Sequence, residues 1–138
     1  MMNEFFGISV PVMGLIQLLI TLFLAVLFLQ SGLDKVFDYK GNLSYFTDHF
    51  SGSPLAPTVA LMTFVITITE TAAGVLCALG VVWLLLFGSP DFAFLGTLVA
   101  ALNLIMLFFG QRVAKDYGGA AILVPYFILT MVGLFVLA

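Results

Sequence analysis

The sequence predicts an all-α integral membrane protein, a four-helix bundle of up-down-up-down topology with a short interfacial helix between helices 1 and 2. One reason is composition, since the 138 residues are 63% hydrophobic and 8% charged, with a mean hydropathy of +1.26. An ordinary soluble domain has about 45–50% apolar and about 25% charged residues. The other reason is that four stretches reach the roughly 20 apolar residues that a spanning helix needs. We expect a single transmembrane domain over residues 1–138.

The positions of the spans follow from the distribution of apolar residues. The predicted spans cover about residues 10–33, 59–87, 92–110 and 120–137. A tight turn separates the second span from the third at Gly88-Ser89-Pro90-Asp91, because Gly and Pro interrupt helices. No Lys or Arg precedes the first span and no small-residue cleavage site follows it, so we expect a retained helix instead of a signal peptide.

The basic residues indicate an orientation. Lys35 and Lys40 lie between the first two spans, and Arg112 and Lys115 lie between the last two. In an up-down-up-down bundle these two connections share one side. Because Lys and Arg concentrate in cytoplasmic loops, we expect that side to be cytoplasmic and both termini to lie outside, in a bacterial inner membrane. Four basic residues also argue against a nucleic-acid partner, which needs a clustered basic face.

The connection over residues 34–57 is the one sizeable segment predicted outside the bilayer. Asn42 is a candidate helix N-cap, and Gly52 stands where a helix would stop. Between them the apolar residues recur at helical spacing, namely Leu43, Phe46 and Phe50. This pattern is typical of a short amphipathic helix in the headgroup layer, and an aromatic-rich loop folded over the bundle end fits it equally well. In either case the segment covers the mouth of the bundle.

Each predicted span carries one narrow face of small or polar residues, because positions 3, 4, 7 and 11 apart share a helix face. In the first span these are Gly14, Gln17, Thr21, Ala25 and Gly32, and in the second Thr63, Thr67, Glu70, Gly74 and Cys77. In the third they are Gly96, Ala100, Asn103 and Gly110, and in the fourth Gly119, Tyr126, Thr130 and Gly133. Transmembrane helices associate through close backbone approach and interhelical hydrogen bonds. We therefore expect these faces to form the interior and the bulky faces to meet lipid.

Glu70 is an acid inside an apolar span, with no other ionisable group within about twenty residues. Counted inward from the cytoplasmic ends at 1.5 Å per residue, Thr21 and Glu70 lie roughly 18 Å deep, and Asn103 and Tyr126 roughly 13–15 Å deep. In a hydrocarbon core about 30 Å thick, all four fall near the midplane. We expect them to converge, with Glu70 hydrogen-bonded to one or more of the others.

The charge of Glu70 depends on its neighbours. Burial disfavours a carboxylate, so we expect a neutral acid at pH 7 unless a pocket or a partner supplies water or a cation. Lys35 or Arg112 would reach Glu70 only by bending away from the interface, and we expect neither to do so. Two interpretations remain open. The acid either links helices, for roughly 0.6–2 kcal/mol, or handles protons or contacts a ligand.

Four segments carry a family resemblance: FLQSGLDKVFDY, SYF…SPLAP, ITETAAGVLCALG and KDYGGAAILVPYFIL. In order and spacing the chain resembles the DoxX-like family of small four-helix membrane proteins. The positions that look like the family's motif residues are Asp34, Lys35, Glu70, Gly74, Lys115 and Asp116. The resemblance implies a redox neighbourhood, because members are associated with thiosulfate:quinone oxidoreductase and with membrane redox or oxidative-stress complexes. One departure is that many members carry an arginine early in helix 1, where this chain has no charge.

No motif in the sequence attaches a cofactor. Paired haem histidines, CxxCH, cysteine clusters, phosphate-binding glycine loops and Ser/His/Asp sets are all missing. The single His49 has no second His or Cys at metal-site spacing, so we expect no metal site and an ordinary interfacial residue. We expect the chain itself to bind no cofactor, with a quinone as the one candidate ligand.

Three functions remain open. The leading hypothesis is a non-catalytic accessory subunit of a larger membrane redox complex, respiratory and quinone-linked, and hence a chain that is not an enzyme on its own. The second is a quinone-reducing subunit that uses Glu70, Asn103 and Tyr126. The third is a small membrane carrier, which the lack of inverted repeats or broken helices makes the weakest. The predicted partners are the lipid bilayer and a larger integral membrane complex.

Overall fold

Four long helices make up most of the computed structural model, which describes residues 2–138. They are α1 (Val12–Phe37), α3 (Val59–Phe87), α4 (Asp91–Val113) and α5 (Tyr117–Leu137). Each is long and apolar enough to cross a membrane. A shorter helix, α2 (Tyr39–His49), and a 3-10 turn, η1 (Ala56–Thr58), connect α1 to α3. The predicted class, an all-α membrane bundle with a short helix between the first two spans, is confirmed.

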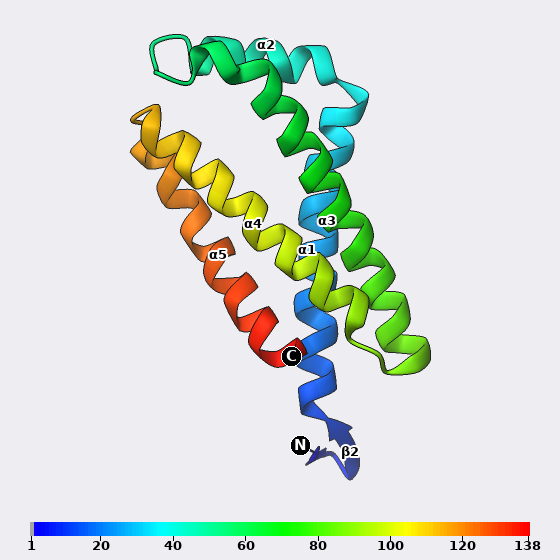
Figure 1. Ribbon diagram of the computed structural model, residues 1–138. Coiled ribbons are helices and arrows are strands. Elements are labelled where there is room, and N and C mark those ends of the chain that lie inside the picture. The colour runs from blue at the N-terminus through cyan, green and yellow to red at the C-terminus, as the bar shows by residue number, and fades with distance from the viewer. Residues whose placement is uncertain (1) are drawn as a thin grey trace.

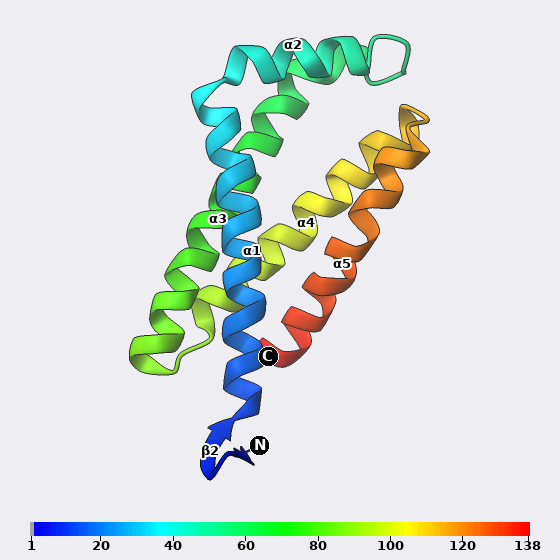
Figure 2. The ribbon, with the colours of Figure 1, turned by 180° about the vertical axis from the view of Figure 1, so that it is seen from behind.

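The long helices alternate in direction. Figures 1 and 2 show both chain termini at one end of the bundle, hereafter the terminal end, and α2 across the other, hereafter the α2 end. The central helix is α3, which packs against α1 on one side and α4 on the other, and α5 packs mainly against α4. Near the terminal end α5 also meets α1, where Gln17 Nε2 donates a hydrogen bond to the Val136 carbonyl at 2.7 Å.

Close helix contacts occur where the predicted small residues lie. A Cβ atom on Gly74 of α3 would stand 2.6 Å from the Leu29 backbone nitrogen of α1. A Cβ atom on the predicted Gly96 of α4 would stand 2.7 Å from the Cys77 backbone nitrogen of α3. A Cβ atom on Gly80, which lies outside the predicted faces, would stand 2.6 Å from the Ala93 backbone of α4. Only glycine permits such approaches, so these positions set the spacing of the helices. Gly14 is an exception among the predicted interior residues, because it is exposed on the first turn of α1.

Two segments differ from the prediction. The first ten or so residues form an antiparallel hairpin of β1 (Met2–Phe5) and β2 (Ile8–Pro11), which the apolar pattern did not indicate. The tight turn of the hairpin places Phe6 and Gly7 at positive φ values of 52° and 78°. At its other end, α1 continues to Phe37, four residues beyond the predicted end of the first span.

The connecting helix α2 begins and ends earlier than predicted. Its N-cap is Asp38, whose carboxylate accepts from the Gly41 backbone N–H at 3.3 Å. Asn42, the predicted cap, lies inside the helix and donates its amide to the Asp38 carbonyl at 2.9 Å. Asp and Asn cap helices about equally well. Because α1 continues to Phe37, the next residue, Asp38, becomes the cap of α2. The predicted stop at Gly52 is also late, because α2 ends at His49.

Candidate functional site

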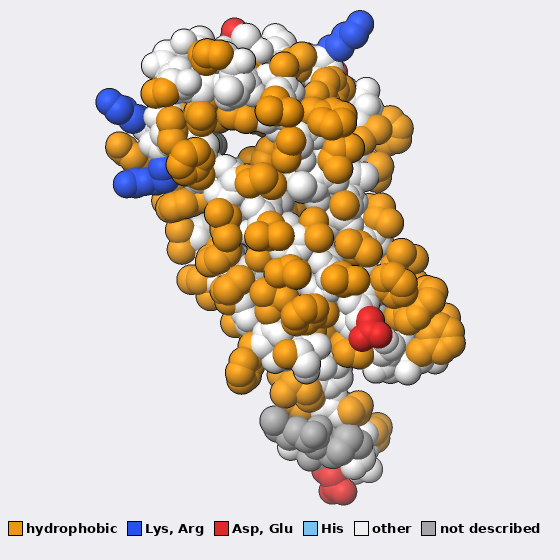
Figure 3. All heavy atoms as spheres, in the orientation of Figure 1, with side chains coloured by type: hydrophobic (Ala, Val, Ile, Leu, Met, Phe, Trp, Pro, Cys, Tyr) orange, Lys and Arg blue, Asp and Glu red, His pale blue; other side chains and the backbone are white. Residues whose placement is uncertain are grey.

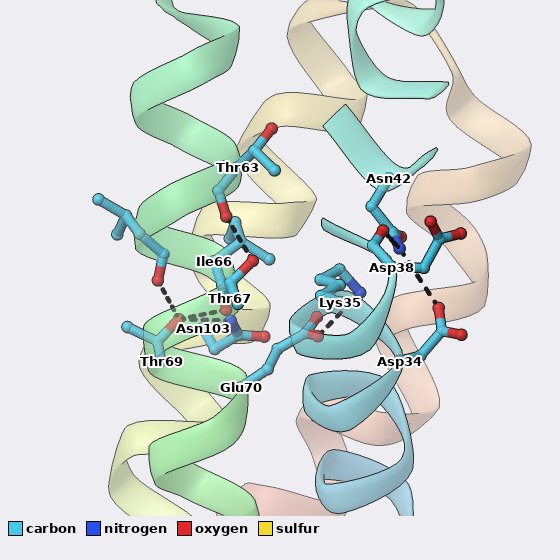
Figure 4. A network of polar contacts seen from close by, with 11 residues as sticks. Asp34, Lys35, Asp38, Asn42, Thr63, Ile66, Thr67, Thr69, Glu70 and Asn103 are labelled. Atoms are coloured by element: carbon cyan, nitrogen blue, oxygen red, sulfur yellow. Dashed lines mark hydrogen bonds and ion pairs between the residues drawn. The ribbon is translucent and has the colours of Figure 1, made fainter. Parts of the chain in front are cut away.

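The Glu70 side chain lies between α3 and α1 and is paired with a base. Glu70 is 4% exposed, and its Oε2 lies 2.9 Å from Lys35 Nζ. Figure 4 shows the two side chains pointing toward one another from the two helices. The expectation that no basic residue reaches Glu70 is therefore wrong. Lys35 is helical and needs no bend away from the interface, because α1 extends past the predicted end of the span.

Close packing of α1 on α3 brings the pair together. A Cβ atom on Gly32, three residues before Lys35, would stand 2.8 Å from the Thr71 backbone, next to Glu70 in sequence. Together with the contact at Gly74, this keeps the two backbones nearly touching on both sides of Glu70. At this separation the four-carbon stem of the lysine brings its ammonium group to the carboxylate.

A second polar contact joins α3 to α4 at Thr69, the residue before Glu70. Asn103 of α4 is fully buried, and its Nδ2 donates to Thr69 Oγ1 at 2.7 Å. The Thr69 hydroxyl lies 2.9 Å from the Val65 carbonyl of its own helix, to which it donates in turn. Figure 4 shows the amide oxygen of Asn103 on the side of Glu70. The central helix therefore holds polar partners on both of its neighbours within two consecutive residues.

Three buried oxygen atoms around this contact have no hydrogen-bond partner among the described residues. They are Glu70 Oε2, which has the ion pair with Lys35, Thr71 Oγ1 and Asn103 Oδ1. Unpaired buried polar atoms are rare in folded proteins and require an explanation. Glu70 and Thr71 are consecutive residues of α3, and the Thr71 hydroxyl lies against Gly32 of α1, whereas Asn103 reaches α3 from α4. Thr71 Oγ1 and Asn103 Oδ1 can each accept a hydrogen bond from a water molecule or a polar ligand.

The predicted convergence of four polar side chains is wrong. Thr21 donates its hydroxyl to the Gln17 carbonyl at 2.6 Å and lies fourteen residues before Lys35, about 21 Å along α1. Tyr126 instead places its ring 6.5 Å from that of Phe23. No hydrogen bond in residues 2–138 joins Glu70 to Thr21, Asn103 or Tyr126. Equal distances along two helices do not give equal depths in the bundle, because the first turns of α3 extend beyond the end of α1.

Three other motif positions serve the connections. Asp116 is the N-cap of α5 and accepts from the Gly119 backbone N–H at 2.9 Å. Lys115 precedes it with a positive φ of 60°, at the turn between α4 and α5. Asp34 is exposed on the last turns of α1. Of the predicted motif residues, the structure thus brings together Lys35, Glu70 and Gly74, and places the others at the α2 end.

His49 joins α2 to the α4–α5 turn, a contact that the sequence pattern missed. Its Nε2 lies 2.7 Å from Gln111 Oε1 and 3.5 Å from Asp116 Oδ2. Phe50, the next residue, is 6% exposed and faces Gly110 of α4. The helix α2 is therefore attached at both ends, to α1 by the chain and to the α4–α5 turn by His49.

The described residues include no group of three or more His, Cys, Asp or Glu side chains that could hold a metal ion. Cys77 is unpaired and fully buried. The chain is thus a multi-pass membrane protein whose central polar feature is a buried Lys–Glu pair at one helix crossing. It belongs to the DoxX family, whose family model matches residues 16–110. No curated protein and no solved structure matches the chain.

Proposed function

We propose that the protein is a non-catalytic accessory subunit of a larger membrane redox complex, and that it binds a partner subunit through the outer face of α1. The redox and quinone-linked setting rests on what the family resemblance implies. The partner contact rests on one feature of the bundle, an exposed amide on a face that otherwise meets lipid. That residue is Gln30.

The outer face of α1 carries large apolar side chains at helical spacing. These exposed side chains lie on one helical stripe, namely Leu19, Leu22, Phe23, Val26 and Leu33. Gln30 continues this series and lines the same shallow groove. Such spacing is that of side chains which interdigitate with a second helix. The face is therefore suited to a transmembrane helix of another subunit.

The unpaired amide of Gln30 favours contact between this face and a partner helix. Gln30 lies four residues before the exposed Asp34, which places it about 6 Å further into the membrane span. Helix side chains lean toward the helix N-terminus. In α1 that direction leads from the α2 end into the bilayer, so the amide group lies deeper than the Gln30 backbone. No hydrogen bond joins the Gln30 amide to another described residue, whereas the Gln17 amide of the same helix is bonded to Val136. An amide without a partner in hydrocarbon is costly, and a polar group on a partner helix removes that cost.

The test is gentle solubilisation of the native protein, followed by identification of the subunits that purify with it. We expect a larger membrane protein to accompany the chain. Gln30→Leu and Val26→Trp should weaken this association. Ile128→Trp is the matched control, because Ile128 is 57% exposed on α5, on the opposite side of that helix from Tyr126, whose ring lies near Phe23. Consistent purification of the chain alone, or equal association in all three variants, would refute the proposal.

A second candidate function is a quinone-reducing subunit, favoured by the buried Lys35–Glu70 pair and by the unpaired amide oxygen of Asn103. Lys35 Nζ would donate to a quinone carbonyl oxygen, and Asn103 Oδ1 would accept from a quinol hydroxyl. Reduction of a quinone to a quinol consumes two electrons and two protons, and the electrons would come from a partner subunit. The Glu70→Gln substitution removes the ionisable carboxyl group and leaves the size and shape of the side chain nearly unchanged. Unchanged quinone reduction in a complex that contains this variant would exclude a proton role for Glu70.

We further propose that the α2 end faces the cytoplasm of a bacterial inner membrane. The support is the placement of Lys40, Arg112 and Lys115 at that end, where Figure 3 shows the lysine and arginine side chains. Impermeant thiol reagents applied to intact cells with the outer membrane permeabilised should label Ser9→Cys and leave Lys40→Cys unlabelled. The opposite result would reverse the orientation.

A further inference from the structure

The helices α3 and α4 leave a pocket between them at the α2 end. They touch near the terminal end, where Gly80 meets Ala93, and they separate toward α2, as Figures 1 and 2 show. At the α2 end, Gly110 of α4 faces the ring of Phe50 instead of α3. The remaining space forms a pocket of about 320 Å³. Figure 3 shows the surface hollowed just beneath α2.

The lining of this pocket is almost entirely apolar. Its walls include Met62 and Ile66 of α3 and Met106 of α4, and Phe46 of α2 lies over it. The lining residues with polar side chains already have partners inside the protein. Thr58 and Thr63 donate their hydroxyls to the Leu55 and Val59 carbonyls, and Gln111 is bonded to His49. A buried water needs two to four polar partners, so the pocket is poorly suited to water.

An empty space of this size would be expensive. The atoms that line an empty apolar pocket have no van der Waals partners on its open side, so they lose those contacts outright. The pocket also opens into the bilayer, because Leu61 and Phe109 line it and are 66% and 61% exposed. Hydrocarbon from the membrane can therefore enter and restore the missing contacts.

We propose that the pocket between α2, α3 and α4 binds one acyl chain of a membrane phospholipid. The chain enters from the bilayer past Leu61 and Phe109, and its tip lies against Ile66 and Met106. Van der Waals contact with the lining holds it there, because transfer from one hydrocarbon environment to another supplies no hydrophobic gain. This site is separate from the outer face of α1 and does not depend on the proposed subunit contact.

The site can be tested with a photoactivatable lipid. The protein is reconstituted in phosphatidylethanolamine and phosphatidylglycerol vesicles that contain a phospholipid with a diazirine near the end of one acyl chain, and the crosslinked residues are mapped by mass spectrometry. Ile66 is 8% exposed and lies inside the pocket, so we expect it to be labelled. Leu24 and Ala73 are buried elsewhere in the bundle, with 0% exposure, and should remain unlabelled.

Two variants separate entry into the pocket from contact with the protein surface. Met106→Trp fills the pocket and should abolish the Ile66 crosslink. Met131→Trp makes the same change at a position of α5 that is 40% exposed to lipid and should preserve it. Circular dichroism spectra and thermal unfolding of both variants show whether each is folded. Absence of the crosslink in the wild-type protein, its persistence in folded Met106→Trp, or recovery of an isoprenoid quinone or a protein segment at this site would overturn the proposal.

Discussion

Replacement of Lys35 by methionine should destabilise the protein by an amount that depends on pH. The change leaves Glu70, 4% exposed, without its cation. A buried carboxylate without a partner is costly enough that the group takes up a proton instead. At pH 7 this requires protonation about 2.7 units above the ordinary glutamate pKa of about 4.3, which costs about 3.7 kcal/mol at 1.36 kcal/mol per unit. We expect Lys35→Met to lose about that much unfolding free energy.

The dependence on pH has a definite sign. The folded variant binds one proton that the unfolded chain releases at pH 7, so its unfolding free energy rises as the pH falls. The slope is about 1.36 kcal/mol per unit between pH 7 and pH 5, which is still above the pKa of an ordinary glutamate. The loss relative to the wild-type protein should therefore shrink to about 1 kcal/mol at pH 5.

A double-mutant cycle tests whether the pair itself carries the effect. Unfolding in mixed micelles by sodium dodecyl sulfate, followed by circular dichroism, measures the stability of each variant. Glu70→Gln should cost less than Lys35→Met, about 1.5 kcal/mol, because Lys35 lies on the last turn of α1 and can extend toward the headgroups. The double variant should be more stable than the sum of the two losses implies. Additive losses, or a loss in Lys35→Met that is the same at pH 7 and pH 5, would refute the reasoning.

Three further predictions concern contacts between helices. Gly74→Ala should disrupt the crossing of α1 and α3 and lower the thermal unfolding temperature strongly, whereas Gly52→Ala, with nothing within 4 Å of the added Cβ, should leave it unchanged. Asn103→Leu removes the hydrogen bond to Thr69 and should cost about 0.6–1.7 kcal/mol in the same micelle titration; no loss would show that the bond contributes nothing. His49→Ala frees one end of α2 and should speed amide hydrogen exchange in α2 while α4 stays protected, and equal exchange in both would contradict that role.

Much of the fold follows from local properties of the chain. The four spans are set by runs of apolar residues, since a stretch of that length without charges is stable in hydrocarbon only as a helix. The interior faces of the helices also follow from spacing, because Thr63, Glu70 and Gly74 repeat at helical periods and are all buried. The same rule would have found Lys35. It continues the buried series Thr21, Ala25, Phe28 and Gly32 by three residues, but it lies two residues beyond the predicted end of the span at residue 33.

The partners of the polar residues were decided only by the tertiary structure. The spacing of residues along one helix predicts which face of that helix a side chain occupies. It does not predict how far a neighbouring helix is shifted along the bundle axis. Here the glycine contacts at Gly32 and Gly74 set that shift, which brings Lys35 to Glu70 and leaves Thr21 far away. The divergence of α3 and α4 beyond the Thr69–Asn103 hydrogen bond, and the pocket that it creates, likewise depend on how the helix backbones pack against one another. A sequence pattern read one helix at a time contains no information about that packing.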